Sequence, residues 1–200
     1  PYYWNIAPQR DATLTPVIYS RRGVGADTEA RYLEARHAGE LHWHLLPSDR
    51  VFGAARNALQ WQQQGLAFGT RASDALRWGH SGARVSDDTY WKDFPRVLGT
   101  LTPRLLPLAT HAERDAVVAG LQTTAYARTQ HWQVLQDPDP LALIEAPYHR
   151  VPQLGWRGAG PLPAWGRSID AEFEIEFNRF ELTANDAVTG RTQGWHVARR

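Results

Sequence analysis

Apolar and polar side chains alternate at every step of the stretch Ala171-Glu172-Phe173-Glu174-Ile175-Glu176-Phe177-Asn178. Successive side chains of a β-strand point to opposite sides, so Phe173, Ile175 and Phe177 would share one face of a strand. The three glutamates and Asn178 would share the other face, whereas a helix would scatter them around its circumference. This stretch therefore predicts a β-strand with one apolar face and one polar face.

Further β-strands are expected along most of the chain. The same alternation recurs in residues 40–45, 59–64 and 76–79. Other segments are rich in Thr, Val, Ile and aromatic residues, which suit a pleated surface. These segments are residues 11–20, 120–134, 150–158 and 191–198.

Clusters of Gly, Pro, Asn and Asp separate these segments and predict turns. They lie at residues 21–23, 47–50, 137–140, 158–166 and 185–190. A strand of about ten residues with its connection gives roughly ten strands in this length. No helical pattern, exact repeat or domain linker is visible, so an all-β, antiparallel meander is expected over residues 1–200.

The composition excludes several classes of protein. Hydrophobic residues make up 42% of the 200 residues and charged residues 22%, which is unlike a disordered chain. A net charge of +1 argues against nucleic-acid binding driven by bulk charge. With no cysteine, disulfide frameworks, thiolate zinc sites and cysteine nucleophiles are excluded within this segment. No apolar run is long enough for a membrane-spanning helix, and the first residues have no signal-peptide pattern.

Two architectures fit long alternating strands. Soluble β-sandwiches alternate in the same way, but their strands usually have about five or six residues. Outer-membrane barrels have longer strands with a polar interior and a lipid-facing, apolar surface that carries aromatic girdles. The chain has nine Trp, seven Tyr and six Phe at a mean hydropathy of −0.49, which favours an aromatic surface over a thick, dry core. The pattern by itself leaves both architectures open.

Six motifs occur in one order along the chain and resemble the LptD family of outer-membrane lipopolysaccharide-assembly proteins. They are PYYWNIAP at residues 1–8, DATLTP at 11–16, SRRG at 20–23 with RYL at 31–33, VSDDTYWKDF at 85–94, APYHRVPQL at 146–154 and FNRF at 177–180. Each motif is moderately specific, and the ordered set is more specific. The match is weaker at residues 51–84, 105–120 and 160–167.

The resemblance implies that this chain is part of a large transmembrane β-barrel in the outer membrane of a Gram-negative bacterium. The family has a signal sequence, a periplasmic β-jellyroll and then the barrel, and its disulfides lie outside the segment covered here. The 200 residues would therefore form the first barrel strands, with no second domain. As a fragment they would form an open, curved antiparallel sheet with two unprotected edges.

The resemblance also implies a transport function without catalysis or cofactors. The family receives lipopolysaccharide from a periplasmic transport bridge and inserts it into the outer leaflet, with the saccharide passing through the lumen. An LptE-like lipoprotein plugs that lumen, and the exit is a lateral gate between the first and last strands. The expected partners are therefore lipopolysaccharide, the plug, the bridge and outer-membrane lipid, and no nucleic acid.

Three prolines are candidates for the gate: Pro1, Pro8 and Pro16. Proline cannot donate to a strand ladder, so each one weakens pairing where it occurs. The resemblance places Pro1 and Pro16 at positions that the family uses to loosen its gate. The alternative is that Pro1 and Pro8 start and end a short strand, and that Pro16 marks a bulge.

The polar strand positions are candidates for a hydrated surface that faces the lumen: His42, His44, Gln60, Gln62, Glu172, Glu174 and Glu176, with Gln64 beside them. Such a surface would hydrogen-bond a passing saccharide without binding it tightly. The alternative is an ordinary solvated face of a sheet.

Other chemistries fit the same residues less well. His42 and His44 share a strand face, as a metal site needs, but no third ligand can be placed. Glutamates 172, 174 and 176 contain the paired carboxylates of a glycosidase, yet three in alternation are typical of a polar wall. A soluble carbohydrate-binding module is the second functional hypothesis. Its stacking platform would be Trp43, Trp61, Trp78, Trp132 and Trp156.

Overall fold

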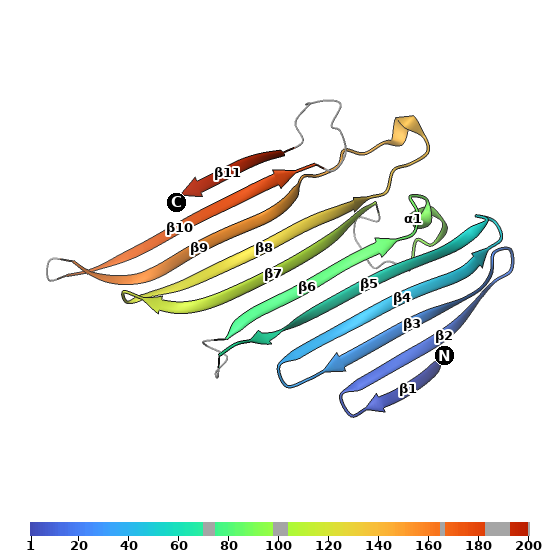
Figure 1. Ribbon diagram of the computed structural model, residues 1–200, viewed down its shortest axis with the longest axis horizontal. Helices are drawn as coiled ribbons and strands as arrows, with labels where there is room; N and C mark the ends of the chain where they lie inside the picture. Colours follow the sequence, from blue (N-terminus) through green and yellow to red (C-terminus); the bar gives the residue numbers. More distant parts are fainter. Residues whose placement is uncertain (70–74, 98–103, 165–166, 183–192, 200) are drawn as a thin grey trace. The chain divides into compact units, whose positions relative to one another are not determined.

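The computed structural model describes residues 1–69, 75–97, 104–164, 167–182 and 193–199. These residues form eleven strands that are hydrogen-bonded in chain order in one sheet (Figure 1). The strands are β1 (Tyr2–Ala7), β2 (Arg10–Tyr19), β3 (Gly23–Leu33), β4 (His37–Asp49), β5 (Ala54–Ala67), β6 (Leu76–Val85), β7 (Leu105–Val118), β8 (Leu121–Val134), β9 (His149–Ala164), β10 (Arg167–Glu181) and β11 (Gln193–Arg199). The all-β prediction is thus confirmed.

Every strand pair whose register is described is antiparallel, and the strand order follows the chain without a crossover. Nine of the eleven strands have ten or more residues, and β9 has 16. The expected antiparallel meander of long strands is therefore present, with β1 and β11 at the two ends of the order. The part of the chain that the structure describes holds no helix with the length and hydropathy needed to span a bilayer.

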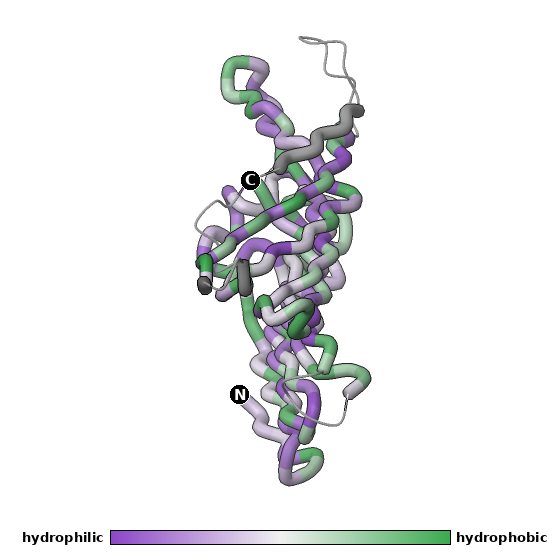
Figure 2. The backbone as a smooth tube through the Cα atoms, turned by 90° about the vertical axis from the view of Figure 1, so that its left-hand side faces the viewer, coloured by the Kyte–Doolittle hydropathy of each residue, from purple (hydrophilic) through white to green (hydrophobic). Residues whose placement is uncertain are grey.

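The chain divides into two compact units, which we describe separately. Unit 1 comprises residues 1–64, 80–108 and 132–145. Unit 2 comprises residues 65–79, 109–131 and 146–200. Hydrophilic and hydrophobic residues follow one another at short intervals along the backbone (Figure 2).

In unit 1 the strand register separates two kinds of side chain. Leu14 on β2 is opposite Thr28 on β3, which is opposite Trp43 on β4. One position along, Thr15 is opposite Asp27, which is opposite His44. Directly opposed side chains lie on the same face of a sheet. One face therefore carries Trp43 with its apolar neighbours, and the other carries the acidic and histidine side chains.

A short connection covers part of the polar face of unit 1. Residues 86–97, between β6 and β7, include helix α1 (Tyr90–Asp93). Pro95 lies just after this helix, and proline does not allow a helix to continue. We call residues 86–97 the strap. Its Tyr90 and Phe94 pack into a core together with residues from the strands beneath. That core consists of Leu46, Ala58, Ala83, Val85, Tyr90, Phe94, Leu106 and Leu135.

In unit 2 the stretch that predicted the fold lies within β10. Phe173, Ile175 and Phe177 are opposite Gly158, Trp156 and Leu154 on β9. The glutamates at 172, 174 and 176 alternate with them, opposite Ala159, Arg157 and Gly155. The alternation predicted for residues 171–178 is thus confirmed. A second connection, between β8 and β9, contains the 3₁₀ turn η1 (Pro140–Ala142).

One predicted turn is wrong. Residues 158–166 were expected to form a connection because they are rich in Gly and Pro, but β9 continues to Ala164. Gly158 is a packing residue here, since a Cβ at this position would lie 2.6 Å from the Phe173 ring. Pro161 lies within the strand, opposite Asp170. The turn predicted at 47–50 starts later, because β4 ends at Asp49; the turn predicted at 185–190 lies outside the described residues.

Candidate functional site

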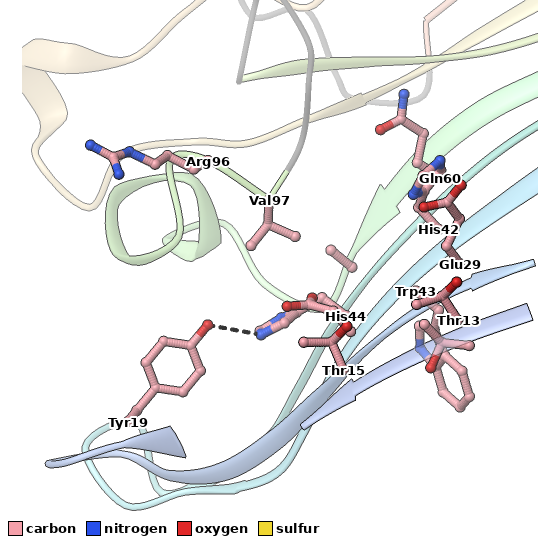
Figure 3. Close-up of a pocket in the computed structure, with 13 residues that line it drawn as sticks. Thr13, Thr15, Tyr19, Glu29, His42, Trp43, His44, Gln60, Arg96 and Val97 are labelled. Atoms are coloured by element: carbon pink, nitrogen blue, oxygen red, sulfur yellow. Dashed lines mark hydrogen bonds between the residues drawn. The ribbon is translucent and has the colours of Figure 1, made fainter. Parts of the chain in front are cut away.

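A polar cavity lies on the polar face of unit 1, over β2 to β5 (Figure 3). Its volume is about 440 Å³. Strand residues line its base, and Arg96 and Val97 of the strap line its rim. Two carboxylates and two imidazoles are among its lining residues, which include Asp27, Glu29, His42, His44 and Gln60. The cavity thus offers hydrogen-bond donors and acceptors on several neighbouring strands.

The structure places the four candidate residues of unit 1 on this face, but in different surroundings. His42 is opposite Glu29 and is exposed. Gln60 lines the same cavity, and Gln62 lines a smaller one of about 200 Å³ beside it. His44 is only 2% exposed, because the strap covers it. Three of the four thus face open space, whereas His44 belongs to a packed interior.

His44 is the centre of a chain of hydrogen bonds between β2 and the strap. The Tyr19 hydroxyl on β2 and His44 Nε2 are 3.1 Å apart, and His44 Nδ1 is hydrogen-bonded to the Tyr90 hydroxyl. Burial raises the pKa of Tyr90 well above its ordinary value, so this phenol stays neutral. The Phe94 ring packs against both Tyr19 and His44, with centroids 5.4 and 5.0 Å away.

Arg56, near the start of β5, has a fully buried side chain surrounded by carboxylates. It donates two hydrogen bonds to Asp87, at 2.9 and 2.8 Å, and one to Asp93, at 2.5 Å. It also contacts Asp49, the last residue of β4, at 3.4 Å. Arg22, in the turn between β2 and β3, donates to Asp49 at 2.7 Å and to Asp93 at 2.5 Å. We call these five residues the Arg56 cluster.

Aromatic rings surround the guanidinium of Arg56. Its Cζ atom lies 4.5 Å from the ring centroid of Phe52, 5.2 Å from that of Tyr90 and 5.0 Å from that of Phe94. A planar guanidinium can stack on rings and bind carboxylates in its plane at the same time, which a lysine cannot do. The site is therefore specific for arginine.

Asp87, the second residue of the strap, accepts hydrogen bonds from several donors. Burial by itself would raise the pKa of its carboxyl, but hydrogen bonds from Arg56, Ser86 and Thr89 outweigh that effect and lower the pKa. The Thr89 backbone N–H donates to Asp87 at 3.1 Å and the Thr89 hydroxyl at 2.8 Å. The ionised carboxylate thus both binds Arg56 and shapes the first turn of the strap.

On the polar face of unit 2 the Glu176 carboxylate is held by three hydrogen-bond donors. Glu176 accepts hydrogen bonds from Tyr126 at 2.7 Å, Gln153 at 2.8 Å and Asn178 at 2.6 Å. Glu174 shares this face opposite Arg157, and Glu172, one step further along β10, is exposed. A carboxylate tied to three donors resembles part of a polar wall more than the acid or base of a glycosidase.

The three prolines lie at or beside β1 and β2. Pro1 precedes β1, and Pro8 lies in the two-residue connection to β2. Pro16 lies within β2, opposite Ala26, and the β2–β3 register runs through it without a shift. Pro16 therefore does not mark a bulge against β3. The irregularity lies in the β1–β2 pair, between Asn5 and Ala7.

Two alternative chemistries receive no support from the geometry. Among the described residues, no three His, Cys, Asp or Glu side chains are grouped so that they could hold a metal ion. Two of the five tryptophans proposed for sugar stacking have aromatic neighbours of their own. Trp156 packs edge-on against Phe173, with centroids 4.7 Å apart, and Trp61 lies 5.7 Å from the His80 ring.

Sequence reasoning missed the Arg56 cluster. Its carboxylates are 7, 31 and 37 residues away from Arg56, so no local pattern joins them. One signal was present: the segment 87–94 combines three aspartates with Tyr90, Trp91 and Phe94 in a connection. Acidic and aromatic residues together in a loop suit an arginine that is both paired and stacked.

The fold and the two different faces of its strands define a class of protein. An antiparallel meander of long strands, with one polar face and one apolar, aromatic face, has the strand pattern of outer-membrane β-barrels. Comparison with known proteins gives the family. Residues 56–194 match the family model LptD, described as LPS transport system D. The chain belongs to the LptD family, as its motifs had indicated.

Curated relatives carry the same name. The LPS-assembly protein LptD of Paracidovorax citrulli is 40% identical over 197 residues, which cover 96% of this chain and 22% of that protein. The LptD of Acidovorax sp. strain JS42 is 42% identical over 200 residues, covering 96% and 23%. The LptD of Burkholderia ambifaria is 35% identical over 192 residues, covering 95% and 22%. The chain thus spans less than a quarter of the length of these relatives.

Proposed function

We propose that this chain is the first part of the barrel of an outer-membrane protein that assembles lipopolysaccharide (LPS) in the outer leaflet. One observation carries the proposal: a family match to LPS transport system D extends over strands that have one polar and one apolar face, as in β9 and β10. The relatives at 40% and 42% identity are named LPS-assembly proteins. The carbohydrate-binding module is not favoured, because nothing in these comparisons points to it.

The two faces then have separate tasks. The apolar face, with Leu14 and Trp43, contacts outer-membrane lipid, since apolar and aromatic residues are stable there. The polar face, with His42, Gln60, Gln62 and the glutamates of β10, lines a hydrated lumen through which the saccharide passes. His44 contributes by holding the strap.

The partners follow from this arrangement. A periplasmic transport bridge delivers LPS, and an LptE-like lipoprotein occupies the lumen against the polar face. The gate lies at β1, and the three prolines at or beside β1 and β2 cannot donate ladder hydrogen bonds there. The process moves a lipid and requires no covalent step.

Photo-crosslinking in living cells tests the two faces. A photoreactive amino acid is placed at His42 or, as a matched control, at the adjacent Trp43 on the opposite face of β4, in the full-length protein. LPS in transit should crosslink at position 42, and the adduct should fall at least about fivefold when LPS synthesis is blocked. Adducts at position 43 should persist, because outer-leaflet LPS remains. No LPS adduct at position 42, or one insensitive to the block, would refute the proposal.

A further inference from the structure

The strap connects strands that are far apart in the sheet order. It leaves β6 at Ser86 and reaches β2, where Phe94 packs against Tyr19. Further along, Val97 lines the cavity together with Thr13 and Thr15 of β2 (Figure 3). The strap therefore crosses the polar face over β3, β4 and β5. It holds the second strand of the sheet to the sixth.

Charged contacts fasten this crossing at the end of β2. Arg22, directly after β2, binds Asp93 of the strap and Asp49 of β4, and its side chain is 19% exposed. Asp93 also binds Arg56 on β5. Because Arg56 is fully buried and paired, releasing Asp93 would leave it with fewer partners in the interior. The end of β2 is thus tied to β4 and β5 as well as to the strap.

The two neighbours of β2 hold it very differently. On one side, β2 and β3 are paired without a shift over ten consecutive positions, from Arg10 with Tyr32 to Tyr19 with Gly23. On the other side, β1 has only six residues, and its pairing shifts between Asn5 and Ala7. The part of β2 after Leu14 extends beyond the described pairing with β1. That part is where Tyr19 and the strap meet.

We propose that the strap holds β2 in place, so that β1 is the strand that moves when the gate opens. We call this restraint of β2 by the strap the brace. This inference rests on the proposed function of the β1 edge. Arg22 and Arg56 are positioning residues in it, and they act by holding the strap on β2. The prolines near β1 and the brace on β2 then restrict strand separation to the β1 edge of the sheet.

Hydrogen exchange of the full-length protein, in complex with its plug, tests the brace. Amides of β2 that bond to β3 should be protected like those of β3, and amides of β1 (residues 2–7) should exchange much faster. The variant Arg22→Gln removes the contacts to Asp93 and Asp49. It should raise exchange at the end of β2 at least about tenfold, as expected for the loss of a charge-assisted hydrogen bond.

The matched control is Arg10→Gln. Arg10 also lies on β2 and also has a carboxylate partner, Glu34, but its side chain is 58% exposed and does not touch the strap. This variant should leave exchange of residues 15–19 unchanged. If Arg22→Gln does not assemble, Tyr19→Phe keeps the ring and removes only the hydroxyl bonded to His44, and it should raise exchange of β2 severalfold.

Two results would overturn the brace. One is wild-type β2 exchanging as fast as β1. The other is an equal effect of the strap variants and Arg10→Gln on β2. Neither measurement involves LPS, so a failed brace is distinguishable from a failed transport function, which the crosslinks at positions 42 and 43 report independently.

Discussion

Arg56 is a charged side chain that the surrounding sheet and strap remove completely from water. A buried guanidinium is tolerated only when carboxylates and further hydrogen bonds replace its hydration. Asp87, Asp93 and Asp49 supply the carboxylates, and three aromatic rings cover the flat faces of the group. Through these contacts Arg56 fixes the end of β4 and the strap in one arrangement.

Arg56→Met should therefore destabilise the protein strongly. Removing the cation leaves Asp87 without its main partner and takes one partner each from Asp93 and the buried Asp49, which costs about 3–5 kcal/mol in comparable buried pairs. The measurement is the free energy of unfolding of the full-length protein in lipid vesicles, from urea titrations.

The matched control for this prediction is Arg77→Met. Arg77 also binds a carboxylate, Asp115 at 2.5 Å, but both side chains are about 40% exposed. An exposed pair contributes less than about 1 kcal/mol. Equal losses in the two variants would show that the burial of Arg56 has no special energetic role.

At the scale of strands, the alternation of residue types predicts the strands correctly where the side chains are large. Phe, Ile and Glu in residues 171–178 left no alternative to a strand, and β10 contains them. β3 (Gly23–Leu33) escaped notice, because its apolar face is made of small residues such as Ala26, Thr28 and Ala30. The glycines and prolines at the end of β9 predict a turn, but Gly158 lies within the strand and leaves room for the Phe173 ring of the next strand.

The short first strand gives the element-scale prediction. Replacing Pro16 by Thr restores a backbone N–H in β2 and suits a strand. The added N–H supplies one more backbone hydrogen bond to β2, which strengthens the strand pairing beside the gate by roughly 0.5–1.5 kcal/mol. LPS export by the full-length protein should then slow by about two- to tenfold. The measurement is the rate at which new LPS reaches the surface, together with permeability to a large antibiotic.

Pro161→Thr is the matched control for this substitution. Pro161 also lies within a strand, β9, but far along the chain from β1. Export should be unchanged in that variant. If Pro16→Thr leaves both surface LPS and drug permeability at wild-type levels, the prolines do not set the strength of the gate.

At the scale of the whole molecule, sequence alone indicated the family and the two-faced strands, and the structure added what connects them. The motif at residues 85–94 carried part of the resemblance, yet its physical role appeared only when Asp87, Tyr90 and Asp93 were seen around Arg56. His44 shows the same limit: its place on the polar face follows from alternation, but its burial depends on the strap. Contacts between distant segments have no periodic signal in the sequence.

The central claim is that the protein containing this chain carries LPS to the cell surface, and depletion tests it most directly. The full-length gene is placed under a repressible promoter, new LPS is pulse-labelled, and the labelled LPS accessible at the surface is measured over time. We predict that surface LPS stops rising as the protein is depleted, while labelled LPS accumulates inside the cell, and that a plasmid copy restores delivery. Delivery of new LPS at an unchanged rate in depleted cells would contradict the claim.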